Sequence, residues 1–549
     1  MTRFKKVQLK RQLNPGGDSI IPKVLLIICV GALLAFGQAA AAATVAPNET
    51  ANTTTPIMEN TTENLTNEHA TAVVSAEGSG FVARNAVGEI IESGSEAASV
   101  IQSAVDDVSA GGVVTIQQGT YTIKSSINVK KSITLRGEGM PTFKSGTESY
   151  LIECKGTLLK SERPGEDVSA NSTSVSVEDA SGLEVGDLIL IFDETQWNPW
   201  DAGWYQRMKT GELQRVERVD GNEIGFNDPL LHGYSLSMNA GVQYIRPITV
   251  SIEGIEIQGG SNTAMYSGID MRYTIDSSIK GCHIENCGLR STHIMDCYET
   301  TISECTIEKS EKTGYGYGVD VHSSSAYTRI VNNTIDRCRH CVTIVAHPGS
   351  SIGVPRETYV EDNFLSGSIG HTIDAHPCAE SWYIYNNEIT HNDGTKYLVN
   401  NAAKYCEVKG NTFHDGYGCR KRQDIRDITF IIENNTFDNV KDCADTTDRG
   451  TVKCFEFSGN ECNNCQNFMV KSTIAEDVTI TGNTYNGKES GEVIFVKNAE
   501  SGSIEGNVIE GSIKNRINVQ GSVNVLLEGN SGTEDPVSDA SASNLSASE

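Results

Sequence analysis

Two polar patterns recur in the middle of the sequence. The stretches GVDVH and TIDAH each place an aspartate two residues before a histidine, at Asp320/His322 and at Asp374/His376, and TIVAH supplies His347 between them. A neutral imidazole can take a proton from a substrate near pH 7, and a neighbouring carboxylate can orient that imidazole. These five residues are therefore the principal candidates for catalysis.

Further polar residues flank this pattern. His371 lies three residues before the second aspartate, and Arg337, Arg339 and His340 precede the central histidine. Arg272 takes the position of the pattern histidine in an earlier repeat. We expect His371 and Arg339 to serve as acid or carboxylate-neutralising groups beside the catalytic residues. Arg337 and Arg272 are candidates for substrate binding.

A short phrase of the type VKGNTF repeats from about residue 250 to the C-terminus. Its fourth residue falls at Cys282, Cys305, Asn333, Asn363, Asn387, Asn411, Asn435, Asn460, Asn483, Asn507 and Asn530. A period of about two dozen residues with alternating apolar positions predicts a solenoid of short strands. Asparagine tolerates the left-handed backbone of a turn, and stacked asparagine side chains can hydrogen-bond from coil to coil. The predicted fold is an all-β, right-handed parallel β-helix.

This repeat, together with the opening IQSAVDDVSAGGVVTIQQGTYTI, resembles the pectate-lyase-like superfamily of right-handed β-helix proteins. The resemblance covers roughly residues 85–157 and 246–532. It implies the β-helix fold and polysaccharide as the class of substrate or ligand. Because members of such folds differ in chemistry, the resemblance leaves the reaction open.

Strand alternation places the polar patterns on one face of the predicted coil. Apolar residues such as Val319, Val321, Ile373 and Ala375 alternate with the polar ones and should face the core. The spacing predicts one outward column at Arg272, Cys297, His322, His347, His376 and Asn401. A second column is predicted at Asp270, Met295, Asp320, Val345, Asp374 and Val399.

Three chemistries suit this predicted face. Proton abstraction from a uronate sugar needs a base, an acid across the ring and a cation against the carboxylate. Inverting glycoside hydrolysis could use Asp320 and Asp374, which two strand spacings separate by about 9–10 Å, near the upper limit of about 6.5–9.5 Å for inverting enzymes. Metal binding by the histidines is third, because no motif such as His-x-x-x-His supports it, and we assign no metal ligand.

The stretch HTIDAHP (371–377) favours the first chemistry. It resembles the Tyr-x-x-Asp-Pro-His motif of β-helix mannuronan C5-epimerases, matching it at Asp374 and His376. His371 stands where that family has its tyrosine, and Asn400 falls near the position of a further aspartate. The resemblance implies a proton-abstracting site centred on Asp374 and His376.

The remaining regions define the predicted domains. Residues 1–43 read as a signal peptide, with basic residues, the apolar run VLLIICVGALLAFG and small residues after it. Residues 44–80 form an Asn/Thr-rich linker carrying N-glycosylation sequons, and 81–157 hold an N-terminal cap and the first coils. The cap is a helix within 93–112 with a Ser93/Glu96 capping box. A β insertion (158–245), the main β-helix (246–532) and a disordered tail (533–549) follow.

The composition limits the partners. The chain has 44 basic and 71 acidic residues among 549, a net charge of −27, which argues against nucleic acid. Contact with a membrane is expected only through an uncleaved N-terminal segment, and the oligomeric state stays open. We assign no cofactor, although a bound Ca²⁺ could offset the acidic surface. The cysteines, which include the one-coil-apart pairs Cys282/Cys305 and Cys419/Cys443, suit either disulfides or buried thiols in an exported chain.

Two stretches outside the polar pattern could also contact substrate. Trp197, Trp200 and Trp204 cluster in QWNPWDAGWYQR and could stack on sugar rings, or could simply pack a loop. The basic run GCRKRQDIRD (418–427) could receive an anionic polymer, but a solvated turn is the favoured interpretation.

The sequence therefore predicts a secreted or cell-surface, carbohydrate-active β-helix. The best single expectation is a polysaccharide lyase or C5-epimerase acting on an acidic polysaccharide, with His376 as the base and Asp374 as its partner. A non-catalytic surface glycoprotein for adhesion or envelope structure is one alternative, and an inverting glycoside hydrolase is another.

Overall fold

The structure, a computed structural model, describes residues 69–200, 207–347, 351–391, 396–422, 425–487, 492–510, 517–532, 537–538 and 546–548. The predicted signal peptide and the linker up to residue 68 lie outside the described residues. The described residues all belong to one compact unit, Leu65–Glu549. Within them, none of the helices has the length and apolar character needed to span a bilayer.

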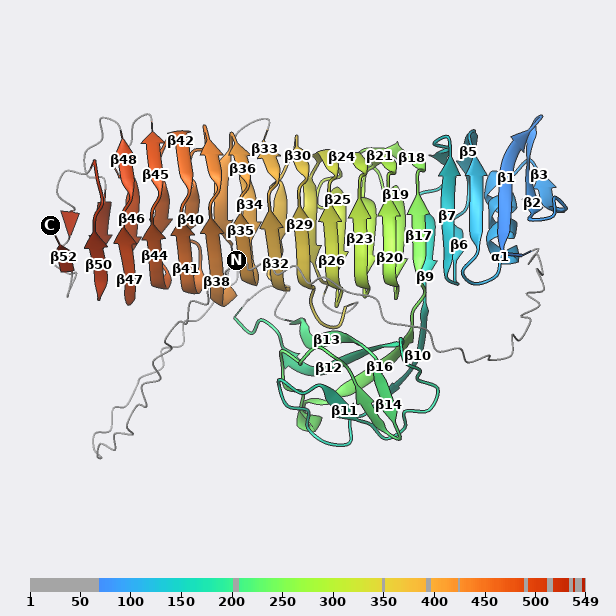
Figure 1. The fold of residues 1–549 in the computed structure, drawn as a ribbon, viewed down its shortest axis with the longest axis horizontal. Helices are drawn as coiled ribbons and strands as arrows, with labels where there is room; N and C mark the ends of the chain where they lie inside the picture. The colour runs from blue at the N-terminus through green and yellow to red at the C-terminus, as the bar shows by residue number, and fades with distance from the viewer. Residues whose placement is uncertain are drawn as a thin grey trace, which may run out of the picture. The chain divides into compact units, whose positions relative to one another are not determined.

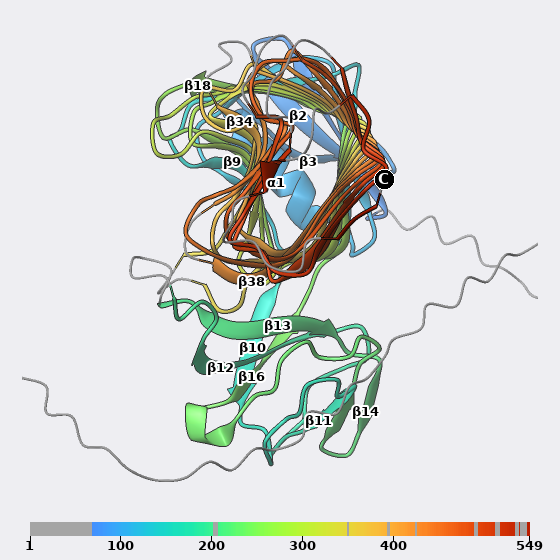
Figure 2. The same ribbon diagram turned by 90° about the vertical axis from the view of Figure 1, so that its left-hand side faces the viewer.

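Most strands wind into a solenoid with three parallel sheets, here named A, B and C (Figures 1 and 2). The parallel ladder of sheet A contains β7 (Ile133–Glu138), β17 (Val250–Glu253), β20 (Ile275–Lys280), β23 (Tyr298–Ser303), β26 (Ala326–Val331), β29 (Arg356–Glu361), β32 (Ala379–Tyr385), β35 (Ala403–Lys409), β38 (Ile425–Glu433), β41 (Gly450–Ser458), β44 (Ala475–Thr481), β47 (Ser501–Glu505), β50 (Val525–Glu528) and β52 (Ser546–Ser548). Sheet B contains β5 (Thr120–Ile123), β8 (Thr142–Ser145), β18 (Glu256–Ser261), β21 (His283–Cys287), β24 (Thr306–Ser310), β27 (Thr334–Cys338), β30 (Phe364–Ser366), β33 (Glu388–Thr390), β36 (Thr412–His414), β39 (Thr436–Asp438), β42 (Glu461–Cys465), β45 (Thr484–Gly487) and β48 (Val508–Glu510). Sheet C contains β6 (Ile127–Val129), β9 (Tyr150–Lys155), β19 (Ser267–Arg272), β22 (Arg290–Met295), β25 (Tyr317–His322), β28 (His340–Val345), β31 (Ile373–Ala375), β34 (Tyr397–Asn401), β37 (Tyr417–Lys421), β40 (Ala444–Thr446), β43 (Val470–Ser472), β46 (Ile494–Lys497), β49 (Ile517–Gln520) and β51 (Val537–Ser538).

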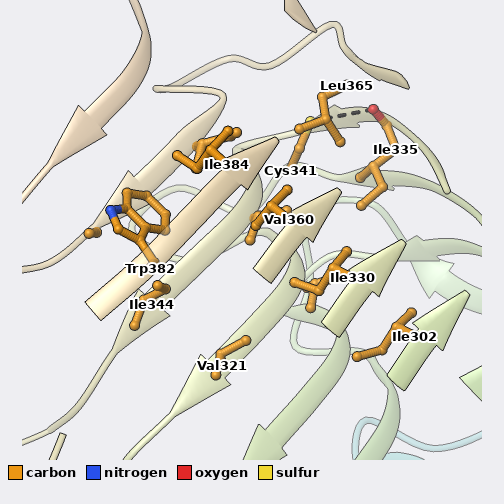
Figure 3. Packing of buried hydrophobic residues seen from close by; sticks show 14 of the residues in the cluster. Ile302, Val321, Ile330, Ile335, Cys341, Ile344, Val360, Leu365, Trp382 and Ile384 are labelled. Atoms are coloured by element: carbon orange, nitrogen blue, oxygen red, sulfur yellow. Dashed lines mark hydrogen bonds between the residues drawn. The ribbon is translucent and has the colours of Figure 1, made fainter. Parts of the chain in front are cut away.

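The interior of the coil is a stack of apolar rows, one row for each inward position of a sheet. Ile302, Ile330, Val360 and Ile384 pair in register through β23, β26, β29 and β32, and all are fully buried (Figure 3). Because strand side chains alternate between faces, the residues between them point outward. The all-β solenoid predicted from the repeat is therefore present.

Buried asparagines connect the coils at the turn between sheets A and B. The Oδ1 atom of Asn363 accepts hydrogen bonds from the backbone N and the Nδ2 of Asn333, at 2.9 and 3.0 Å. Asn333 Nδ2 also donates to the carbonyl oxygen of Ile302, at 2.9 Å. The same relay continues through Asn387, Asn411, Asn435, Asn460, Asn483, Asn507 and Asn530. This asparagine ladder provides the partners that buried amide groups require.

The left-handed position lies one residue before the one that we predicted. Asn332, Asp362 and Asn386 have φ values of 57°, 54° and 55°, whereas the following ladder asparagines are absent from the positive-φ positions. Later coils place glycine there, as at Gly410 with φ 67°. The ladder asparagine is therefore selected for its amide, and the preceding residue for its backbone conformation.

The first coils include a short helix. The strands β1 (Thr71–Glu77), β2 (Gly80–Asn85) and β3 (Ile90–Gly94) pair antiparallel, and β1 also pairs parallel with β4 (Val113–Gln117). The helix α1 (Ala97–Asp107) buries Ile101 and Val105 in the same apolar cluster as the solenoid interior. The capping box was wrong, because Glu96 is the N-cap residue and makes no side-chain capping hydrogen bond. Ser93 belongs to β3.

The boundaries of the predicted linker and of the predicted C-terminal tail differ from those expected. The strand β1 lies within residues predicted as linker, since Ala72 and Val74 are fully buried in the core. The short strands β51 and β52 fall within the tail that was expected to be disordered.

The insertion forms two antiparallel sheets with their own core. One contains β10 (Thr157–Glu162), β16 (Gly241–Arg246), β12 (Leu188–Gln196) and β13 (Lys209–Arg215), and the other contains β11 (Ser174–Ser176), β15 (Glu223–Gly225) and β14 (Arg218–Asp220). Polar contacts join the insertion to sheet A. Arg356 Nη2 donates to the carbonyl of Leu213 at 2.9 Å, and Tyr298 OH donates to Asp228 Oδ2 at 2.7 Å.

The cysteines of the described residues carry free thiols, and all except Cys454 are buried. Cys305 and Cys282 continue the asparagine ladder toward the N-terminus. The backbone N of Cys305 donates to Asn333 Oδ1 at 2.9 Å, and that of Cys282 to Cys305 Sγ at 3.4 Å. Cys419 and Cys443 are neighbours in adjacent coils, with the backbone N of Cys419 donating to Cys443 O at 2.9 Å, while Cys443 Sγ lies 3.4 Å from Cys465 Sγ.

The asparagine ladder gives the first prediction. Replacing Asn411 with alanine should destabilise the solenoid by roughly 2–4 kcal/mol, because the amide groups of Asn387 lose their acceptor in the buried turn. The control is Asn463→Ala, whose exposed side chain bonds to Glu461. Urea unfolding should show a lower midpoint for the ladder variant, and equal midpoints for the two variants would contradict the role assigned to the ladder.

Candidate functional site

A column of mainly polar residues follows the outer face of sheet C. In register, it contains Glu153, Asp270, His293, Asp320, Thr343, Asp374, Asn400, Arg420 and Asp445. Asp320 and Asp374 do lie in one column, with Thr343 between them. We call this set the site column.

The predicted histidine column was wrong in register at His347, although Arg272 and His322 do share a column through Met295. His322 pairs with Val345 in β28, while His347 lies two residues beyond that strand and His376 directly follows β31. The coils differ in turn length, so equal spacing in sequence does not give equal height on the sheet. His293, which the spacing did not select, takes the position expected for Met295. The rings of His322 and His347 nevertheless stack, with centroids 5.3 Å apart.

Asp374 is the centre of a buried charged cluster. Its side chain is 1% exposed, and Arg422 Nη1 donates to both carboxylate oxygens at 2.9 Å. Asn400 Nδ2 donates to Oδ1, while His376 Nε2 and His340 Nε2 lie 3.2 and 3.4 Å from Oδ2. We call these five residues the Asp374 centre.

The ionisation states in this centre follow from burial and from Arg422. Burial lowers the pKa of His340 and of His371 to about 4 and the pKa of His376 to about 3. Burial also acts to raise the pKa of Asp374, but Arg422 and the nearby imidazoles outweigh it and hold this pKa well below its usual range. At neutral pH the carboxylate is therefore ionised and the histidines are uncharged.

A second cluster lies toward the N-terminal end of the same face. Arg290 Nε donates to Asp320 Oδ2 at 2.5 Å, and Arg290 Nη1 donates to Tyr150 OH at 3.1 Å. His293 Nδ1 lies 2.6 Å from Asp270 Oδ1. The Asp320 side chain is fully buried, and its Oδ1 has no hydrogen-bond partner among the described residues. Burial, with the neighbouring His293 and Arg290, holds the pKa of His322 well below its usual range.

Aromatic rings and cations lie along sheet C beside the site column. Tyr317, His340, His371, Tyr397 and Tyr417 form a continuous series with ring centroids 5.1–6.2 Å apart. Three cations cover rings of this series: Arg339 lies 5.8 Å from the centroid of Tyr317, Arg420 lies 4.5 Å from that of Tyr397, and Lys441 lies 5.0 Å from that of Tyr417. Positive charge and aromatic rings thus meet here on a strongly acidic chain, with Tyr317 and His340 buried and the other three rings partly exposed.

The two arginines predicted to bind substrate, Arg337 and Arg272, lie on different sheets. Arg337 lies in β27 of sheet B and pairs with Asp336 at 2.7 Å and with Glu308, so its assignment to this face was wrong. Arg272 is at the end of β19, where Nη2 lies 3.7 Å from Asp296 Oδ2.

The predicted tryptophans lie on the insertion. Trp197 is 4% exposed, whereas Trp200 is 52% exposed, and Trp204 lies outside the described residues.

The basic run 418–427 is the signal that the sequence interpretation undervalued. It supplies Arg422 to the Asp374 centre and Arg420 to the site column, so its interpretation as a solvated turn was wrong for these two residues. Arg290 and His293 gave no sequence signal, because their stretch RSTHIM lacks the Asp-x-His pattern.

The ligand atoms of His340, Asp374 and His376 lie close enough together to be tested for a metal ion. They offer two nitrogens and one carboxylate, whereas Ca²⁺ prefers six to eight oxygens. Arg422 also occupies both oxygens of that carboxylate. The donor set therefore does not fit the Ca²⁺ considered from the sequence.

Comparisons with known proteins agree with this architecture. Residues 219–376 match the family described as right-handed β-helix region. The capsule K1-specific depolymerase of Klebsiella phage K64-1 is 23% identical over 283 residues, which are 49% of this chain and 31% of that protein. The chain thus matches about a third of that relative's length.

Two solved structures share the fold. The tailspike gp61 of Pseudomonas phage phi297 has a TM-score of 0.52 and 13% identity, with 80% of this chain and 73% of that chain covered. The tailspike gp49 of Pseudomonas phage LKA1 has a TM-score of 0.51 and 16% identity, with 78% and 75% covered. The chain is a right-handed parallel β-helix protein.

The lowered histidine pKa values predict acid sensitivity. The pKa of a histidine in the unfolded chain is about 6.5, whereas the pKa of His340 in the folded chain is about 4. The free energy of unfolding therefore keeps its full value above pH 6.5 and falls as the pH drops toward 4. At pH 5 each such histidine should lower the free energy of unfolding by roughly 2 kcal/mol. Thermal unfolding of the double variant His340→Gln/His376→Gln should depend less on pH between 7.5 and 5 than that of the unsubstituted chain. Parallel pH profiles would contradict this assignment.

Proposed function

We propose that this chain is an extracellular protein that acts on an acidic polysaccharide at the outer face of sheet C. The observation that carries the proposal is the row of Arg339, Arg420 and Lys441 beside uncharged histidines, on a chain whose net charge is −27. Such a local basic surface attracts an anionic polymer that the rest of the chain repels. The similarity to a capsule depolymerase supports a polysaccharide substrate.

The chemistry that these groups suit best is proton abstraction beside a sugar carboxylate. His376 is the proposed base, because its imidazole is uncharged at neutral pH and the Asp374 carboxylate, 3.2 Å from Nε2, acts against burial to raise its pKa. His371 is the proposed donor, because its Nδ1 accepts the backbone N–H of Tyr397 at 3.2 Å and its proton is therefore on Nε2. Arg420 and Arg339 are the proposed partners of the substrate carboxylate, and Asp374 orients the base.

In this mechanism His376 removes the proton at C5, and the electron pair moves toward the carboxylate, which the arginines neutralise. For a lyase, the C4 oxygen then leaves with a proton from water, which gives an unsaturated sugar. For an epimerase, water returns a proton to C5 from the opposite face, and the Nε2–H of His371 is the proposed hydrogen-bond donor there. Arg272 and His347, which are partly exposed, are the proposed binding groups for neighbouring sugar units, while Asp320 and His322 of the second cluster are buried.

Inverting hydrolysis by Asp320 and Asp374 is the second candidate. Their two-strand separation, about 9–10 Å, favours it. A hydrolase, however, needs one carboxyl group whose raised pKa keeps it protonated. Arg422 instead helps to lower the pKa of Asp374, so this residue is unsuited to be the acid, and we favour proton abstraction. A non-catalytic surface glycoprotein remains the alternative in which the chain is not an enzyme.

A panel of uronate polymers separates these candidates. Incubation in D₂O should give either ultraviolet-absorbing unsaturated ends, for a lyase, or deuterium at C5 without cleavage, for an epimerase. New reducing ends without absorbance would favour hydrolysis. Binding without any product would favour the surface glycoprotein, and a lack of binding would overturn the proposed substrate class.

The variant His376→Gln should lower the rate of product formation by about 10²–10⁴-fold, the usual contribution of a general base. The matched control is His283→Gln, since His283 lies in β21 of sheet B between Glu256 and Glu308. Equal activity of both variants would contradict the role of His376. Arg420→Ala should chiefly raise KM.

A further inference from the structure

We propose that the cavity where the insertion meets the first residues of β35 and β38 is a second sugar subsite. It would take a carboxylate-bearing unit of the same polymer that occupies sheet C, and the inference therefore rests on the proposed function. The cavity has a volume of about 220 Å³, and Trp197, Trp200, Lys404, Arg426 and Asp427 contribute to its lining.

The two tryptophans of this cavity differ in what they do. Trp197 is 4% exposed, and its Nε1 donates to Glu380 Oε2 at 2.7 Å, which fixes the loop of the insertion against the coil. Trp200 is 52% exposed although it is three residues away. An anchoring role accounts for Trp197 but not for Trp200, whose ring is half exposed and has the Arg426 guanidinium beside it.

The polar groups around Trp200 match the chemistry of a charged sugar. The guanidinium of Arg426 lies 4.0 Å from the centroid of the Trp200 ring, so it is held beside an exposed aromatic surface. Lys404 Nζ lies 4.7 Å from the Trp197 ring centroid and 3.7 Å from Glu380 Oε2. A sugar ring can pack on an indole while its carboxylate pairs with Arg426 and its hydroxyls donate to Asp427.

Chain topology places this cavity beside the Asp374 centre. Lys404 follows the last residue of β34, Asn401, by three positions, and Arg426 follows Arg422 by four. The backbone N of Arg422 donates to the carbonyl of Asn401 at 2.7 Å, so these turns are neighbours in adjacent coils. A polymer that leaves the Asp374 centre over the edge of sheet C therefore reaches the cavity next.

The test uses full-length chain carrying His376→Gln, so that bound oligomers are not consumed. Calorimetric titration with uronate dimers and hexamers is compared for Trp200→Ala, Arg426→Gln, the conservative Trp200→Phe and the control Arg218→Ala. Arg218 is an exposed arginine of β14, paired with Glu223 on the insertion. Thermal unfolding verifies that each variant is folded.

The proposal expects Trp200→Ala and Arg426→Gln to weaken hexamer binding by about tenfold and to leave dimer binding unchanged. Trp200→Phe should recover most of the loss, and Arg218→Ala should have no effect. Unchanged hexamer affinity in both variants, or equal losses for dimer and hexamer, overturns the subsite but leaves the proposed function standing. Failure of the parent chain to bind any oligouronate overturns the proposed function and the subsite together.

Discussion

The relay of buried amides at the turn between sheets A and B is the interaction on which the remaining structure depends. Each ladder asparagine accepts two hydrogen bonds from the preceding one and donates to a carbonyl of the preceding coil, as Asn363 does with Asn333 and Ile330. Because these groups are buried, a slipped coil would leave amides unpaired, at a cost of about 1–3 kcal/mol for each group. The ladder therefore holds the coils in register on one side. Variation in chain length then falls on the opposite side, where sheet C and its turns carry the candidate site.

This division explains what the sequence could predict. The ladder positions are regular in sequence, so the solenoid, its period and the apolar rows could be inferred from the repeat. The site column is not regular, because the turns before β28 and β31 differ in length, and the column expected at His322, His347 and His376 had the wrong register. The column of Asp320 and Asp374 follows from spacing, whereas the contact between Arg422 and Asp374 joins residues 48 positions apart and has no local signal.

Arginines gather at sheet C, although the chain as a whole is acidic. Asp320 and Asp374 are nearly inaccessible, and each is held by an arginine, Arg290 or Arg422. Such buried ion pairs are weak stabilisers compared with apolar residues of the same volume. Their presence beside histidines that burial keeps uncharged therefore supports the chemistry proposed for this face. The aromatic series from Tyr317 to Tyr417 runs along the same face in the direction in which the coils stack, and its first two rings, Tyr317 and His340, are buried.

Successive rungs of the asparagine ladder, one asparagine for each coil, are chemically identical. This affects how the number of coils can change during evolution. From Asn333 to Asn530 every rung offers an identical donor and acceptor to its neighbours, so a whole winding could be gained or lost here and the flanking rungs would still fit each other. The two sulfur-bearing rungs at Cys282 and Cys305 lack this interchangeability, since a thiol cannot replace both functions of an amide. Whole coils are therefore gained or lost most easily in the C-terminal half, and the number of coils near the N-terminus is harder to change.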